Sequence, residues 1–457
     1  MTDRHATSVD PATGALLERY PLHDDAAVDA ALGRARAAQL RWWDAGFEHR
    51  AEVLRAIARE LRAEQEPLAQ LICAEMGKTL REARAEVEKS AWVCEYYADN
   101  GADQLAREPI ATEWSETYVQ FPPLGVVLAV MPWNYPVWQV MRAAAPALMA
   151  GNTFVLKHAS NVTGCALALG ELIARVEASL MEVVVIGGRD VARVIADDRI
   201  AAVTLTGSEG AGVAVATACA QALKPSVLEL GGSDPFVVLH DADIDAAADM
   251  GVRARFSNTG QSCVAAKRFI VVEQVADAFE EAFAARAAAL VMGDPREEVD
   301  LGPMARVDLR DELADQVARG VAAGGRVLAG GEVPDGPGAY YAPTVVGGVA
   351  PDSPLAREET FGPAAAVLRV PDEEAAIALA NASPYGLSSS VWSRDVERVK
   401  TLARRVEAGA VFVNTMTASD PRVPFGGVKR SGWGRELGAF GIREFVNVQA
   451  ITVAPRR

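Results

Sequence analysis

The chain has few of the residues that build disulfide frameworks and metal centres. Its 457 residues include five cysteines and five histidines, the cysteines lie far apart, and no C-x-x-C spacing occurs. An odd number of widely spaced cysteines is typical of free thiols in a reducing compartment. Single, scattered histidines provide no ligand cluster for zinc. We therefore expect no disulfide framework, no metal site and a cytoplasmic location.

The sequence also lacks long apolar runs and an excess of positive charge. Its N-terminus is polar, and apolar runs such as Leu124–Met131 have the length of a strand rather than of a membrane-spanning helix. Asp and Glu number 61 against 45 Lys and Arg, which gives a formal net charge of −16. This charge argues against a nucleic-acid partner. The negative net charge does not exclude a phosphate-binding site, because such a site is built from local groups.

The chain is rich in hydrophobic residues arranged in helix and strand patterns. Half of its residues are hydrophobic, and a length of 457 residues is enough for two or three domains. Helical patterns fill residues 24–65 and 67–106, and residues 113–121 alternate like an edge strand or a hairpin arm.

From Gly125 onward, buried strands alternate with helices. The first set of strands is expected at Val126–Val130, Thr153–Lys157, Val183–Ile186 and Ala202–Thr206. A second set begins near Phe236 and includes strands at Phe269–Val272, Ala364–Val370 and Ala410–Val413. This alternation predicts an α/β protein with parallel, doubly wound sheets.

Two side chains suit covalent catalysis. Cys263 follows a Gly-Gln-Ser turn, and Glu229 stands in the sequence Leu-Glu-Leu-Gly-Gly, so that glycine lies near both. A thiol and a carboxylate in such places are candidates for a nucleophile and its base. Considered alone, the pair has a plainer and more frequent explanation, a buried structural cysteine and a loop glutamate.

Further motifs change this balance. They are Met-Pro-Trp-Asn-Tyr-Pro at 131–136, Thr-Gly-Ser at 206–208, Glu-Glu-Thr-Phe-Gly-Pro at 358–363 and Pro-Phe-Gly-Gly at 424–427. Together with Glu229 and Cys263, in this order and at these spacings, they resemble the aldehyde dehydrogenase superfamily. The resemblance extends from Asp10 to the last predicted strand and rests on several separate motifs.

The resemblance implies an α/β fold with two doubly wound, Rossmann-like domains and a small β arm for oligomerisation. The cofactor-binding domain would comprise residues 1–112 and 123–235, and the catalytic domain residues 236–440. Residues 113–122 and 441–457 would form bridging strands of a homodimer or homotetramer. The apolar tail Phe445–Val453 would join a neighbouring subunit's sheet, as in the family, or dock on its own domain.

The resemblance also implies the catalytic residues. Cys263 is the nucleophile, which attacks an aldehyde to give a thiohemiacetal and later a thioester. The side-chain amide of Asn134 and the backbone N–H of Cys263 stabilise the oxyanion. Glu229 activates the water that hydrolyses the thioester. The alternatives are a turn residue before Tyr-Pro for Asn134, and a residue that only ends a helix or strand for Glu229.

The cofactor implied by the resemblance is NADP. Backbone N–H groups after Gly207 can hold a diphosphate at a helix start. At the position of Ser160, NAD-preferring relatives often carry Glu, so that Ser160 and Lys157 together favour a 2′-phosphate. Lys157 has an alternative as a surface lysine at a strand end. The implied cofactor-binding residues are Trp133, Lys157, Ser160, Gly207, Ser208, Leu230, Gly231, Glu359 and Phe361.

The substrate pocket is implied by a narrower resemblance. The segments Lys157–Asn161 and Ser419–Phe425 resemble the short bacterial succinate-semialdehyde dehydrogenases that use NADP. Arg142, on the helix after Asn134, would pair with a substrate carboxylate or else form a salt bridge between domains. The implied substrate-binding residues are Arg142, Ser262, Ser419, Arg422 and Phe425.

We therefore predict an enzyme that oxidises succinate semialdehyde to succinate with NADP. The nearest alternative is the same chemistry on another small aldehyde, such as glutarate semialdehyde. More distant alternatives are a non-redox acyl hydrolase that uses Cys263 and Glu229, and a non-catalytic protein on the dehydrogenase fold. The implied nucleotide site argues against the hydrolase. The joint presence of three catalytic candidates argues against the non-catalytic protein.

Overall fold

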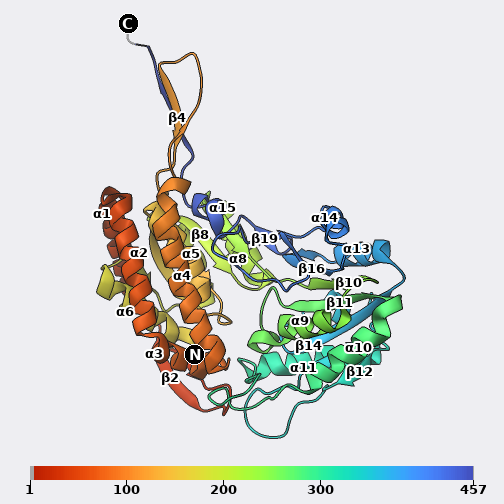
Figure 1. The fold of residues 1–457 in the computed structure, drawn as a ribbon. Coiled ribbons are helices and arrows are strands. Elements are labelled where there is room, and N and C mark those ends of the chain that lie inside the picture. Colours follow the sequence, from red (N-terminus) through yellow and green to blue (C-terminus); the bar gives the residue numbers. More distant parts are fainter. Residues whose placement is uncertain (1–4, 456–457) are drawn as a thin grey trace.

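The chain forms two α/β halves and a protruding β arm (Figure 1). The computed structural model describes residues 5–455. A small hairpin, β1 (His5–Val9) and β2 (Leu16–Pro21), precedes a layer of helices. These helices are α1 (Asp25–Asp44), α2 (Gly46–Ala63), α3 (Gln65–Met76) and α4 (Leu80–Gln104). They match the helical patterns predicted for residues 24–65 and 67–106.

The first sheet has six strands in the order β19-β9-β8-β5-β6-β7. They are β5 (Val126–Met131), β6 (Thr153–His158), β7 (Met181–Val183), β8 (Ile200–Thr206), β9 (Ser226–Glu229) and β19 (Gly432–Trp433). All neighbours are parallel except β19, which runs antiparallel to β9. The prediction of a strand over Val183–Ile186 was wrong, because β7 lies earlier and shares only Val183 with it.

Helices cover both faces of this sheet. They are α5 (Trp138–Ala150), α6 (Thr163–Val176), α7 (Val191–Ala196) and α8 (Glu209–Ala222). Val127 and Ala129 of β5 belong to one hydrophobic core, while Val126 and Leu128 belong to another on the opposite face. A strand buried on both faces needs a continuous apolar run, and β5 has one.

The strand order of the first sheet reverses between β5 and β8. Strands β6 and β7 lie on one side of β5, whereas strands β8 and β9 lie on its other side. Open parallel sheets bind ligands outside the carboxyl ends of their strands at such a reversal. Asn134 follows the carboxyl end of β5, and Ser208 follows that of β8. The topology therefore brings two of the predicted site residues to one edge.

The second sheet has seven strands in the order β12-β13-β14-β11-β10-β16-β17. They are β10 (Asp234–Val238), β11 (Ala266–Val272), β12 (Arg326–Ala329), β13 (Thr344–Gly347), β14 (Ala364–Val370), β16 (Ser388–Trp392) and β17 (Ala410–Val413). Only the pair β12 and β13 is antiparallel within the described part of this sheet. The strands predicted at Ala364–Val370 and Ala410–Val413 have the bounds that the structure gives them.

Most of the remaining elements surround the second sheet, whereas α15 (Gly438–Arg443) packs against α4 and α5. The other helices are α9 (Ile244–Phe256), α10 (Glu273–Ala288), α11 (Val307–Ala322), α12 (Pro354–Arg357), α13 (Glu373–Asn381) and α14 (Val396–Ala403). Two short strands, β15 (Tyr385–Gly386) and β18 (Val428–Lys429), pair with each other. The chain leaves the first sheet after β9 and enters the second at β10, while β19 returns to the first. The domain boundary at residue 235 stays a prediction.

The carboxyl edge of the first sheet meets the amino edge of the second. Cys263 precedes β11, and Phe361 precedes the neighbouring strand β14. The backbone after β9 comes so close that a Cβ on Gly232 would lie 2.8 Å from the carbonyl oxygen of Cys263. Only glycine fits at this contact. The end of β9, with Glu229, is thereby held next to the Cys263 turn.

The arm consists of β4 (Glu116–Gln120) between β3 (Glu108–Pro109) and β20 (Gln449–Val453). It extends away from both halves, and β20 leads to the C-terminal end (Figure 1). The predicted apolar tail thus pairs antiparallel with β4 of its own chain. Among the helices of residues 5–455, none combines the length and the apolar character needed to cross a membrane.

Candidate active site

Cys263 lies in a tight turn between the two sheets. The turn is closed by a hydrogen bond from the N–H of Ala265 to the carbonyl oxygen of Ser262 (3.2 Å). Cys263 is half-buried and contributes to the walls of two cavities, of about 290 and 610 Å³. Gln139, near the start of α5, also belongs to both walls. The thiol thus stands where the two cavities adjoin.

The backbone that leads to Cys263 has an unusual conformation. Asn258 and Thr259 have φ angles of 55° and 54°, a left-handed region that is rare for non-glycine residues and rarest for β-branched ones. The N–H of Asn258 donates to the carboxylate of Glu82 (2.6 Å), and the hydroxyl of Thr259 donates to the carbonyl oxygen of Gly302 (3.1 Å). Contacts from elsewhere in the chain therefore hold this strained turn in place.

Asn134 reaches the same turn from the first sheet. Its side-chain amide donates to the carbonyl oxygen of Gln261 (3.1 Å), and its backbone carbonyl accepts from the side chain of Asn258 (3.0 Å). Asn134 and Cys263 both line the larger cavity. An amide donor and a thiol on one wall form the arrangement that stabilisation of an oxyanion requires.

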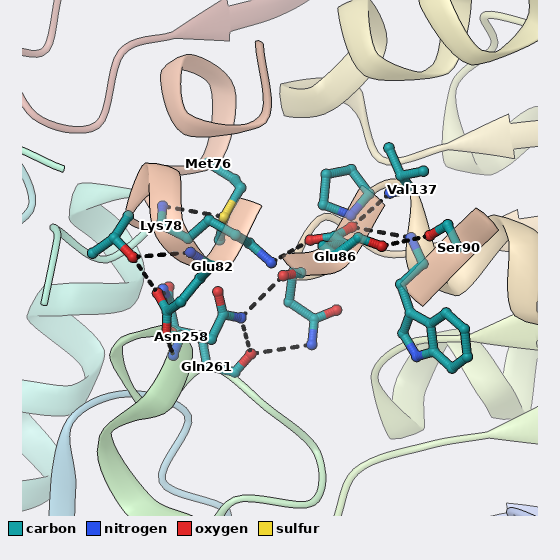
Figure 2. A network of polar contacts seen from close by, with 12 residues as sticks. Met76, Lys78, Glu82, Glu86, Ser90, Val137, Asn258 and Gln261 are labelled. Carbon is teal, nitrogen blue, oxygen red and sulfur yellow. Dashed lines mark hydrogen bonds and ion pairs between the residues drawn. The ribbon is translucent and has the colours of Figure 1, made fainter. Parts of the chain in front are cut away.

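A buried carboxylate on α4 fixes the start of α5. Glu86 accepts hydrogen bonds from the N–H groups of Val137 (2.8 Å) and Trp138 (3.0 Å), and it forms an ion pair with Lys78 (Figure 2). Glu82 lies one helical turn earlier and binds the strained turn described above. Figure 2 shows both carboxylates in one polar network. Helix α4 therefore couples the oxyanion side of the site to the nucleophile side.

Lys267, in β11, connects Cys263 to a residue predicted to bind the cofactor. Its side chain is fully buried, and its ammonium group donates to the carbonyl oxygens of Ser262 (3.1 Å) and Cys263 (2.9 Å) and to the carboxylate of Glu359 (3.0 Å). Glu359 also accepts from the N–H of Gly232 (3.0 Å). These bonds fix Glu359 relative to the thiol. The sequence reasoning missed Lys267, a lysine at the start of an otherwise apolar strand.

The surroundings of the Cys263 thiol favour its neutral form. Burial raises the pKa of Cys263 to about 12, and the charges of Glu229 and Glu359 add to this effect. The cations Arg142 and Lys267 oppose it without reversing it. Nucleophilic attack therefore requires a group that removes the thiol proton.

Glu229 is a buried carboxyl group without partners at the end of β9. Its side chain is 1% exposed, and neither of its oxygens has a hydrogen-bond partner among the described residues. Burial raises the pKa of Glu229 well above its usual value, and the charge of Glu436 raises it further, although Arg142 lowers it. Glu229 lies outside the walls of both cavities. A raised pKa beside a nucleophile is typical of a group that transfers protons.

The larger cavity contains most of the residues predicted to bind the cofactor. The rings of Trp133 and Phe361 meet edge to face with centroids 5.7 Å apart. Ser208 caps α8 by accepting from the N–H of Ala211 (3.4 Å), and the start of this 14-residue helix opens into the cavity. Free N–H groups at a helix start bind phosphates. The residues present therefore fit a dinucleotide. The predicted residues that line the cavity are Trp133, Gly207, Ser208, Leu230, Gly231, Glu359 and Phe361.

Lys157 and Ser160 lie at the carboxyl end of β6, beside β5, but neither lines the larger cavity. Ser160 is exposed, whereas Lys157 is half-buried. Burial lowers the pKa of Lys157, and no described carboxylate forms an ion pair with it. Their contact with a 2′-phosphate stays a prediction.

The smaller cavity brings together most of the residues predicted to bind the substrate. Arg142, Ser262, Ser419 and Phe425 line it together with Cys263. Arg422 does not line it: this side chain is exposed, pairs with Asp420 (2.6 Å) and lies over the ring of Trp92 (5.5 Å to the centroid).

Arg142 forms a buried salt bridge inside the protein. It is buried, forms an ion pair with Glu436 and donates to the hydroxyl of Thr206 (3.2 Å). Its charge is thus compensated within the protein before any substrate binds. Lys89 also lines this cavity and donates to Ser419 (2.8 Å), and the sequence reasoning missed it.

A helical spacing of charged residues in the sequence could have identified Lys89. Glu82, Glu86 and Lys89 recur at intervals of four and three residues, which places them on one face of α4. That face also carries the buried residues Ala83 and Ser90. Charged side chains on a buried helical face need hydrogen-bond or ion-pair partners, so this spacing marks a polar site.

Over residues 5–455, no group of three or more His, Cys, Asp or Glu side chains could hold a metal ion.

The family model described as the aldehyde dehydrogenase family matches residues 1–451. The chain belongs to the aldehyde dehydrogenase family. Membership confirms the family resemblance predicted from the separate motifs, and with it the assignment of the chain as an enzyme.

Relatives with curated names match almost the full length of this aldehyde dehydrogenase. The succinate semialdehyde dehydrogenase Sad of Escherichia coli, named with NAD(P)+, is 49% identical over 454 residues, which are 98% of this chain and 97% of that protein. The succinate-semialdehyde dehydrogenase 1 of Mycobacterium tuberculosis, named with NADP(+), is 46% identical over 453 residues, or 98% and 99% of the two chains.

A solved structure supports the fold assignment in detail. The succinic semialdehyde dehydrogenase from Streptococcus pyogenes, in complex with NADP+ as the cofactor, has a TM-score of 0.96 and 35% identity to this chain. The match covers 98% of this chain and 100% of that one. The predicted α/β fold of the aldehyde dehydrogenase kind is thereby confirmed.

Proposed function

We propose that this aldehyde dehydrogenase oxidises succinate semialdehyde to succinate and uses NADP as its hydride acceptor. The observation that carries the proposal is the position of Cys263 in the walls of two cavities, one with dinucleotide-binding features and one that is small and partly cationic. A volume of about 290 Å³ lies at the lower end of the range for ligand pockets, which suits a four-carbon substrate. The names of the close relatives support this substrate and this cofactor.

The reaction begins at the sulfur of Cys263. The carboxylate form of Glu229 takes the thiol proton and passes it to solvent, the resulting thiolate attacks the aldehyde carbon, and the carbonyl oxygen becomes an oxyanion. The amide of Asn134 uses one N–H for Gln261 and has a second N–H for this oxyanion, and the backbone N–H of Cys263 is a further donor. In enzymes that stabilise an oxyanion with hydrogen-bond donors, removal of one donor lowers kcat by about 10²–10³-fold.

Oxidation and hydrolysis complete the cycle. The chemistry that bound NADP supplies is acceptance of the hydride that leaves the former aldehyde carbon. The succinyl group is then a thioester on Cys263. Glu229 takes a proton from a water molecule, which adds to the thioester carbonyl, the carbon–sulfur bond breaks, and succinate and the thiol are released. Because the pKa of Glu229 is raised, hydrolysis is favoured by higher pH.

Selection of NADP over NAD rests on Lys157 and Ser160. A serine hydroxyl can donate to a 2′-phosphate, and a lysine can neutralise it, whereas a glutamate at position 160 would repel it. The absence of an ion-pair partner for Lys157 among residues 5–455 leaves its ammonium group available for a phosphate. Burial lowers the pKa of Lys157, and a phosphate beside it would stabilise the ammonium form.

A substrate and cofactor panel tests the proposal. The purified enzyme is assayed by the absorbance of NADPH or NADH with succinate semialdehyde, glutarate semialdehyde and butyraldehyde. We expect the highest kcat/KM with succinate semialdehyde and NADP. An equal or better kcat/KM with butyraldehyde would refute the carboxylate specificity, and an advantage for glutarate semialdehyde would favour the longer substrate. Equal kcat/KM with NAD and NADP would refute the cofactor assignment.

We also propose that the arm joins subunits into a homodimer or homotetramer in the cytoplasm. The arm leaves β3 and β20 as edge strands, and exposed edges invite pairing with another chain. Apolar side chains on or next to it are exposed, namely Ile110, Trp114, Val448 and Val453. All five cysteines are free thiols, which suits a reducing compartment. Light scattering after size-exclusion chromatography measures the subunit number, and a monomer would refute the proposal.

A further inference from the structure

The smaller cavity contains a cation without a counter-ion. The ammonium group of Lys89 lies 2.8 Å from the hydroxyl oxygen of Ser419 and 4.5 Å from the centroid of the Trp138 ring. Lys89 is half-buried, and within residues 5–455 no carboxylate forms an ion pair with it. A partly buried cation whose direct contacts are a hydroxyl and an aromatic face attracts an anion strongly.

The other charged groups of this cavity are already engaged. Glu82 and Glu86 accept hydrogen bonds within the network of α4, and Arg142 is paired with Glu436. An anion that enters the cavity therefore meets one cation whose charge is not yet compensated by an ion pair. That cation is on the wall that also carries Ser419.

We propose that Lys89 and the hydroxyl of Ser419 together hold the carboxylate of the substrate, and that Lys89 determines the preference for aldehydes with a distal carboxylate. The inference rests on the proposed function and identifies its specificity residue. Because the ammonium and hydroxyl groups are 2.8 Å apart, the two oxygens of one carboxylate can contact both. Cys263, on the wall of the same cavity, receives the aldehyde end.

The charge of Lys89 gives this specificity a pH dependence. Burial and then the charge of Arg142 lower the pKa of Lys89, Asp420 and Glu86 raise it, and the net result is a pKa of about 8. The ammonium form is therefore present below pH about 8 and is lost above it. The ratio of kcat/KM for succinate semialdehyde to that for butyraldehyde should fall as the pH rises through this value.

The test compares two variants and a matched control. Lys89→Met removes the charge and keeps much of the side-chain length, whereas Lys89→Arg keeps the charge. Lys400→Met removes an equivalent charge from an exposed side chain on α14 that pairs with Glu397. Each protein is assayed with NADP and with succinate semialdehyde or butyraldehyde, two aldehydes of equal chain length.

We expect a loss that is confined to the anionic substrate. Lys89→Met should lower kcat/KM for succinate semialdehyde by about ten- to a hundredfold, chiefly through KM, because a charge-assisted hydrogen bond is lost. Its kcat/KM for butyraldehyde should stay within about twofold of the wild type. Lys89→Arg should retain most of the preference, and Lys400→Met all of it. The pH dependence of the ratio should disappear in Lys89→Met.

Two outcomes would overturn the inference. Equal losses on both aldehydes would indicate a structural role for Lys89, and full retention of the preference in Lys89→Met would leave the proposed function intact without this residue. Inhibition of butyraldehyde oxidation by succinate gives an independent measurement if the wild type shows no preference for the semialdehyde. The inhibition constant should rise about tenfold or more in Lys89→Met, and an unchanged constant would refute the carboxylate site.

Discussion

The buried pair of Glu86 and Lys78 makes a strong prediction about stability. Glu86 is 4% exposed and Lys78 0%, and the carboxylate also serves two backbone N–H groups at the start of α5. In Glu86→Gln the amide can still accept from Val137 and Trp138, but Lys78 keeps its charge without a counter-ion. Breaking a buried pair in this way costs about 3–5 kcal/mol. The ring of Tyr135, 3.8 Å from the ammonium nitrogen, offsets about 0.5–2 kcal/mol of this loss.

Urea unfolding followed by circular dichroism measures the effect. We expect Glu86→Gln to unfold at a lower urea concentration than the wild type, with a free energy of unfolding lower by about 1–4.5 kcal/mol. Lys78→Met should be milder, because Glu86 keeps the N–H groups of the α5 start. The double variant should be more stable than Glu86→Gln alone, since it no longer contains the unpaired lysine.

The same variant should also lose turnover. Asn134 lies three residues before Val137, so a loosened start of α5 moves the amide that holds the oxyanion. The kcat of Glu86→Gln should fall by a larger factor than its KM rises. An unfolding midpoint of Glu86→Gln equal to that of the wild type would refute the reasoning. So would a double variant whose loss equals the sum of the two single losses within about 0.3–0.5 kcal/mol.

Other residues of the site give predictions of their own. Cys263→Ala should abolish NADPH formation and leave NADP binding, measured by tryptophan fluorescence, unchanged; oxidation near the wild-type rate would contradict the nucleophile assignment. Glu229→Gln should slow the later turnovers more than the first and remove the rise of kcat with pH that follows from the raised pKa of Glu229; equal loss of both phases would argue against a role in hydrolysis. Ser160→Glu should reverse or erase the preference for NADP in kcat/KM, and an unchanged ratio would place the 2′-phosphate elsewhere.

Most of the long, buried strands were accessible from the sequence, but the order of the strands within each sheet was not predicted. The strand at Ala364–Val370 was predicted with its observed bounds because it is apolar except for Arg369, as a strand in a sheet covered by helices on both faces should be. The hairpin of β1 and β2 was not predicted. Strand β2 is exposed along most of its length, so it carries no apolar alternation that would mark it as a strand.

The sequence predicted which residues belong to the candidate site but not which of them contact one another. The sequence named Arg142 and Ser419 for the substrate carboxylate, and both do line the smaller cavity. It could not tell that Glu436, far along the chain, compensates the charge of Arg142, because an ion pair between distant residues leaves no local pattern. The helical spacing that ends at Lys89 was visible, but its meaning depended on which element the face of α4 would meet.

The left-handed turn before the nucleophile has a consequence for attempts to make this enzyme more robust. Asn258 and Thr259 each hold a backbone conformation that costs about 1–3 kcal/mol for a non-glycine residue. Glycine at position 259 would relieve that strain, and selection for heat resistance would favour it. It would also remove the hydroxyl that binds Gly302 and let the segment before Cys263 sample other shapes. Variants selected here for survival at high temperature are therefore expected to be slower catalysts, and thermal screens of this enzyme need an activity assay at every round.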